Sequence, residues 1–204
     1  MAKIETVDYK DLAVKAKDIR THAQALNKEL TTAYKSVIDM HKSWYGKRYN
    51  ELAKDFNNLA PTVNEILKIT VKEIPFALET VANNYSQADT NSNVTSAQQT
   101  AETKMENVPT PSDVGMRFIT TDVTSTKESV KKNFKNAVTE MNSIESIYNK
   151  ITWKSEAADA FKAKFTKLKT QIIKEIETIN TQFDRLMKQT LEDIQTTENK
   201  NTVS

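Results

Sequence analysis

The residue types that carry most enzyme chemistry are scarce in this chain. It contains no cysteine, and its two histidines, His22 and His41, fall on one predicted helix, too many turns apart to bind the same metal ion. The only glycines are Gly46 and Gly115, so the glycine-rich turns that cradle phosphates or expose a nucleophilic serine cannot be built. We therefore expect no catalytic residues, no metal site and no cofactor, and a protein that acts by binding.

The remaining unusual residues are two tryptophans in similar short stretches, S-W-Y-G and T-W-K-S, each of which separates two apolar patterns. Ser43 and Thr152 are expected to cap the helix that follows, because a hydroxyl at that position can accept an otherwise unmade backbone hydrogen bond. Trp44 and Trp153 are expected to cover the tips of helical hairpins. Gly46 would allow a close approach of two backbones or a positive φ.

Long amphipathic helices must position these turns. From Leu12, apolar and small residues follow two interleaved series with a spacing of seven, which predicts one long helix. The two series are Leu12, Ile19, Leu26, Ala33, Met40 and Ala16, Ala23, Leu30, Val37, Trp44. A second stripe, from Tyr49 to Tyr85, predicts another helix, which Pro61 and Pro75 should bend or interrupt.

A polar stretch separates these two apolar stripes from two further ones. A polar stretch with Pro109, Pro111 and Gly115 is typical of a linker, and new stripes run from Val123 to Ile151 and from Phe161 to Ile194. The chain is therefore expected to be all-α, with two antiparallel helical hairpins packed as a four-helix bundle. The expected units are a first hairpin at 1–89, a polar linker at 90–117 and a second hairpin at 118–204 whose polar end frays.

Composition excludes several classes of function. The net charge of +2 gives no electrostatic footprint for nucleic acid. The N-terminus lacks the apolar core of a signal peptide, and no run reaches the roughly 18 apolar residues of a membrane span. We expect export, if it occurs, to use a route without a cleaved signal peptide.

Two long helices joined by a tight W-x-G turn resemble the WXG family of ESAT-like proteins, which are substrates of type VII (ESX) secretion. In the first half the resemblance extends to Tyr85 and Asp89, which match the Y-x-x-x-[DE] signal that family members carry just after the second helix. Trp44, Gly46, Tyr85 and Asp89 are the matching positions. The resemblance implies a secreted or cell-surface protein that is recognised by the secretion ATPase, alone or as the targeting partner of a larger co-secreted effector.

The second half departs from the family pattern. Ser155 follows Trp153 in the place of the glycine, and Ile194 and Glu198 replace the tyrosine and the acidic residue. Family members often pair as heterodimers in which one partner carries the signal, so the chain resembles such a pair fused into one pseudo-dimer. Antiparallel pairing would require the linker to run the length of the bundle. About 28 residues can span the roughly 48 Å of a 32-residue helix.

Other possibilities stay open at this point. The chain could be a membrane-active helical-bundle toxin or a plain coiled-coil scaffold, although Lys68, Lys72 and Glu73 interrupt the stripe best suited to insertion. Liposome leakage would favour the toxin. The sequence is compatible with a monomer or a homodimer, and it does not indicate the host, the effector or the activity after export.

Overall fold

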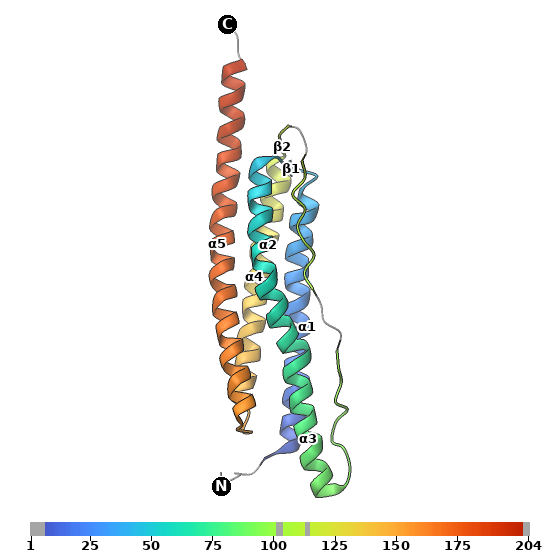
Figure 1. Cartoon of the computed structure of the whole chain (residues 1–204). Helices are drawn as coiled ribbons and strands as arrows, with labels where there is room; N and C mark the ends of the chain where they lie inside the picture. The colour runs from blue at the N-terminus through green and yellow to red at the C-terminus, as the bar shows by residue number, and fades with distance from the viewer. Residues whose placement is uncertain (1–6, 101–103, 113–114, 202–204) are drawn as a thin grey trace.

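The computed structural model describes residues 7–100, 104–112 and 115–201. This part of the chain is mostly helical, and its helices pack side by side as a bundle (Figure 1). The all-α class expected from the sequence is confirmed. In chain order the elements are α1 (Tyr9–Met40), β1 (Trp44–Tyr45), α2 (Lys47–Leu67), the π-helix η1 (Lys68–Glu73), α3 (Ile74–Thr90), β2 (Arg117–Phe118), α4 (Thr120–Asn149) and α5 (Glu156–Asn201).

Helix α1 buries the two seven-residue series on which its prediction rested. Every helical member of those series is buried, and α1 packs against α3 and α4. The helix begins where Asp8 accepts a hydrogen bond from the amide of Asp11 at 2.9 Å, which satisfies one of the free amides of the first turn. α1 therefore buries one face along its whole length.

The second apolar stripe forms α2, η1 and α3 without a break in the chain direction. Pro61 lies inside α2, whereas the helix changes its winding only at η1, just before Pro75. There the amide of Ile74 bonds to the carbonyl of Ile69, five residues back. A π-turn of this kind separates a proline ring from the carbonyls of the preceding turn, where an α-helix would bring them into collision.

The helices run in both directions along the bundle (Figure 1). α1 ascends, α2 and α3 descend, α4 descends and α5 ascends, so the turn after α1 and the turn after α4 lie at opposite ends of the bundle. α5 packs along α2 and contacts α4. Its C-terminal part extends past the ends of the other helices, and the last fully buried residue in it is Thr190.

Two details differ from the sequence-based expectation. α5 continues as helix to Asn201, through most of the tail that was expected to fray. The segment between α3 and β2 has no regular secondary structure in its described residues. Met105 and Val108 of this segment are nevertheless buried in the core, so the expected polar linker also contributes apolar side chains to the packing.

Within the described residues, no helix is both long enough and apolar enough to cross a bilayer.

Candidate functional site

Trp44 lies in the core at the end of the bundle where α1 turns into α2. Trp44 and Tyr45 form β1, which pairs antiparallel with β2, so that Trp44 lies opposite Phe118. The indole is only 1% exposed. Its ring stacks on Phe183 at 5.9 Å between centroids and meets the edges of Phe118 and Tyr49 at 5.4 and 6.3 Å. Trp44 thereby joins α2, β2 and α5.

Gly46 has both properties for which a glycine is needed at a turn. Its φ is +117°, a conformation that side chains strongly disfavour. A Cβ at Gly46 would also lie 3.4 Å from the carbonyl oxygen of Gly115, which has a φ of +119° itself. The two glycines of the chain therefore face each other across the turn.

The expected cap by Ser43 is wrong. The N-cap of α2 is Gly46, which makes no side-chain cap bond. Ser43 instead binds the second half of the chain: its hydroxyl donates to Asp122 at 2.8 Å, and its carbonyl accepts from the amide of Ile119 at 2.8 Å. The serine fixes the start of α4 rather than the start of α2.

The turn after α4 is built differently. Trp153 is half-buried and packs against the edge of the core. The expected cap by Thr152 is wrong here too, because Thr152 is exposed and Ser155 accepts the hydrogen bond from the amide of Ala158 at 3.1 Å. The hydroxyl of Tyr148 donates to the carbonyl of Ala158 and closes the turn from the α4 side.

Tyr85 and Asp89 lie in the last turns of α3, where the chain leaves the bundle. Tyr85 is partly buried, whereas Asp89 is exposed and accepts a hydrogen bond from the hydroxyl of Tyr9 at 2.7 Å. This hydrogen bond raises the pKa of Tyr9 above its ordinary value. Asp89 thus connects the end of α3 to the start of α1, a structural contact that the sequence did not suggest.

The end of α3 and the turn that contains Trp153 lie at the same end of the bundle (Figure 1). Trp44 and Gly46 lie at the opposite end, beside the start of α4. The predicted site residues therefore form two separate groups. One surrounds the buried Trp44, and the other is spread over the end where Tyr85 and Asp89 reach the surface.

A hollow of about 340 Å³ opens beside the Trp44 turn. Its walls come from the turn, from the start of α2, from Gly115 and Met116, and from Thr190 and Asp193 of α5. Arg48, at its rim, donates to Glu51 at 3.2 Å and to Asp193 at 3.4 Å, which ties α2 to the projecting part of α5.

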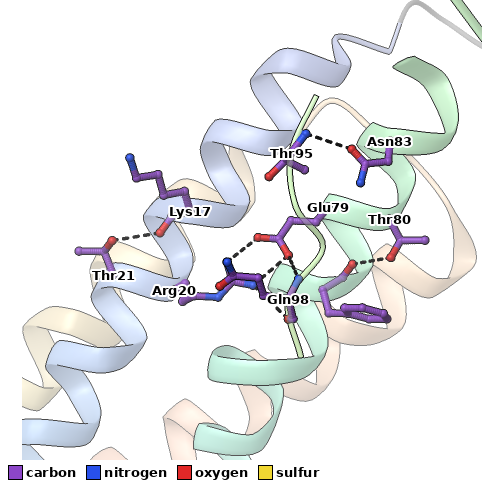
Figure 2. Close-up of polar contacts among 9 residues, drawn as sticks. Lys17, Arg20, Thr21, Glu79, Thr80, Asn83, Thr95 and Gln98 are labelled. Carbon is purple, nitrogen blue, oxygen red and sulfur yellow. Dashed lines mark hydrogen bonds and ion pairs between the residues drawn. The ribbon is translucent and has the colours of Figure 1, made fainter. Parts of the chain in front are cut away.

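A buried ion pair that the sequence did not reveal joins three segments. The guanidinium of Arg20 in α1 makes two hydrogen bonds to Glu79 in α3, the one to Oε2 at 2.9 Å, and Glu79 is only 2% exposed (Figure 2). The same carboxylate accepts from the amide of Gln98 at 2.8 Å. Asn83, one turn further along α3, accepts from the amides of Val94 and Thr95 at 3.2 and 3.1 Å.

The described residues contain no cluster of three or more side chains that could hold a metal ion. His22 lies against Glu140 of α4, with 2.6 Å between Nδ1 and Oε2, and so joins two helices.

Comparison of the chain with protein-family models, curated proteins and solved structures found no match.

Proposed function

We propose that this chain is a WXG-type protein of a type VII (ESX) secretion system, exported as a substrate or as the targeting partner of a larger effector. The observation that carries the proposal is the position of Tyr85 and Asp89 on the final turns of α3, at the surface and at the end of the first helical pair. The W-x-G turn lies at the other end of that pair.

The electrostatics of this helix end support a role in recognition. A helix C-terminus carries a partial negative charge, so a carboxylate there is unfavourable. Asp89 is nevertheless exposed, and its carboxylate accepts a hydrogen bond from Tyr9 at the surface. We infer that the carboxylate is available to a partner, which would be the secretion ATPase.

We also propose that the bundle is an intramolecular pseudo-dimer. α1 with α2 and α3 would be one protomer-like hairpin, and α4 with α5 the other. Three observations support this: the contacts of α1 with α4, the contacts of α2 with α5, and the opposite placement of the two tryptophan turns. The described residues between α3 and β2 run back along the bundle toward the first turn, as antiparallel pairing requires.

Export of point variants from a host that carries the secretion system tests the proposal. Tyr85→Ala and Asp89→Ala should block export of the full-length chain, while the melting temperatures of the purified variants stay within about 2 °C of the parent. Normal export of both variants would refute the proposal.

Tyr9→Phe is the matched control. It removes the hydrogen bond to Asp89 and leaves the carboxylate in place. Export of this variant should be normal. If Tyr9→Phe blocked export as strongly as Asp89→Ala, the carboxylate would act by holding α3 on α1, and direct recognition of Asp89 would be excluded.

A further inference from the structure

Three asparagines of α2 hold the segment that runs back along the bundle. We call residues 104–112 the strap. Asn50 donates to the carbonyl of Pro111 at 2.9 Å, and Asn64 accepts from the amide of Met105 at 2.7 Å. Between them, Asn57 makes both kinds of bond to Val108: it accepts from the amide at 2.8 Å and donates to the carbonyl at 2.9 Å.

The spacing of these contacts matches two different chain geometries. The asparagines are seven residues apart, which is about 10.5 Å along an α-helix and returns to nearly the same face. Their partners in the strap are three residues apart, which is about 9–10 Å in an extended chain. The two spacings are nearly equal. Asparagines placed seven residues apart on a helix can therefore bond in turn to every third residue of an extended chain.

The side chains of the strap follow the same period of three. Met105 and Val108 are 7% and 1% exposed, and Pro111 is partly buried, whereas the residues between them face solvent. A chain with three residues per turn, as in polyproline II, places each third side chain on one face. Pro109 and Pro111 favour that conformation.

Backbone and side chains thus contribute separately to recognition. The hydrogen bonds from Asn50, Asn57 and Asn64 to the strap are made with main-chain atoms, so they fix the direction and the register of the bound segment. Met105 and Val108 are buried in the core, so they make the site selective for particular side chains at these two positions. This division of labour is the one used by sites that bind extended peptides.

We propose that the Asn50–Asn57–Asn64 face of α2 is a binding site for an extended peptide with the pattern M-x-x-V-x-x-P, and that the strap is its resident ligand. The site recognises this class of peptide independently of covalent connection. A partner that presents the same pattern would compete with the strap for this face of α2. The proposal does not depend on the function in secretion.

Binding in trans tests the proposal on the full-length chain. Met105→Ser with Val108→Ser weakens the resident strap, and a fluorescein-labelled peptide of residues 104–112 serves as the probe. Fluorescence anisotropy should show saturable binding to this double variant. Binding should be at least tenfold weaker to the parent, in which the strap occupies the site, and at least tenfold weaker when Asn57→Ala is added to the double variant.

Asn58→Ala, added to the double variant in place of Asn57→Ala, is the matched control, because Asn58 is the neighbouring asparagine and is exposed. It should leave peptide binding unchanged. Absence of binding to the folded double variant, or equal binding to the parent, would overturn the proposal.

Hydrogen exchange on the parent chain gives a second test that needs no destabilised variant. The amides of Met105 and Val108 should exchange at least tenfold more slowly than those of Glu106 and Asn107. Asn57→Ala should accelerate exchange at Val108 at least tenfold and leave Gln98, whose amide bonds to Glu79, unchanged. If Val108 exchanged as fast as Asn107 in the parent, the strap would not be a bound ligand and the proposal would fail.

Discussion

Trp44 and Trp153 each lie in a turn that connects two long helices, yet their rings are buried to different extents. Trp44 is 1% exposed and has three aromatic neighbours, whereas Trp153 is half-buried at the edge of the core. Trp44→Ala should lower the free energy of unfolding by about 3–5 kcal/mol, and Trp153→Ala by less than half of that. Urea denaturation of both variants checks this, and equal losses would contradict the structure.

The buried tyrosines make stability depend on alkaline pH. Burial raises the pKa of Tyr49 to about 12 and that of Tyr148 to about 12, whereas tyrosine in an unfolded chain titrates near 10. Their contribution is complete below about pH 10 and is lost as the pH rises through about 12, because the unfolded chain releases the protons first. The urea midpoint should therefore fall between pH 9 and pH 11.

Tyr49→Phe separates this effect from general alkaline denaturation. The variant lacks the titrating hydroxyl, which donates to the carbonyl of Val37 at 3.2 Å, so its urea midpoint should fall less steeply with pH. A slope identical to that of the parent would show that Tyr49 titrates normally in the folded chain.

Single residues also show where sequence reasoning stops. The demands on Gly46 could be predicted, because φ and close approach are local properties of a turn. The roles of Ser43 and Thr152 could not. Ser43 bonds to Ile119 and Asp122, far along the chain, and the cap of α5 depends on where that helix begins. Several hydroxyl residues near the start of a helix can each serve as its N-cap, so the sequence alone does not say which one does.

At the scale of elements, the pair of Arg20 and Glu79 connects α1 with α3. Their side chains are 13% and 3% exposed. Removal of one partner leaves a charge buried without compensation, so Arg20→Met should cost about 3–5 kcal/mol. The double variant with Glu79→Gln, which retains an acceptor for the amide of Gln98, should cost at least about 1 kcal/mol less than the sum of the single variants. Additive losses in a double-mutant cycle would show that the pair is not coupled.

The elements differ in how readily the sequence predicts them. The helices follow from apolar residues repeated every seven positions, and α1 buries the residues that this pattern selects. The strap was interpreted only as a polar linker, since its two buried side chains are isolated among polar ones. Its period of three and the heptad spacing of Asn50, Asn57 and Asn64 were visible in the sequence. Neither pattern predicts a contact unless it is already known that the two segments lie side by side.

The whole bundle should still assemble when the chain is divided into two fragments. Residues 1–100 and 104–204, co-expressed as separate chains, are expected to form a 1:1 complex, because α1 packs on α4 and α2 packs on α5. Size-exclusion chromatography with light scattering measures this. Two independent monomeric fragments would contradict the pseudo-dimer proposed above.

The C-terminal end of α5 is expected to add little to the stability of the whole molecule. At about 1.5 Å per residue its 46 residues extend about 69 Å, whereas the 32 residues of α1 extend about 48 Å. The described residues after Gln195 are all exposed. A chain that stops after Gln195 should therefore unfold at the same urea concentration as the parent, and a loss above about 0.5 kcal/mol would show that the projecting end packs on the bundle.

The position of Phe183 against Trp44 has a consequence for biosynthesis. Phe183 follows Trp44 by about 140 residues, so at about 5–20 residues per second the indole waits about 7–28 s for its stacking partner to be synthesised. Until then Trp44 lacks the ring that stacks on it in the finished chain. The tryptophan environment at this end of the bundle is completed only after most of α5 has left the ribosome, so an unfinished chain is chemically distinguishable from a finished one.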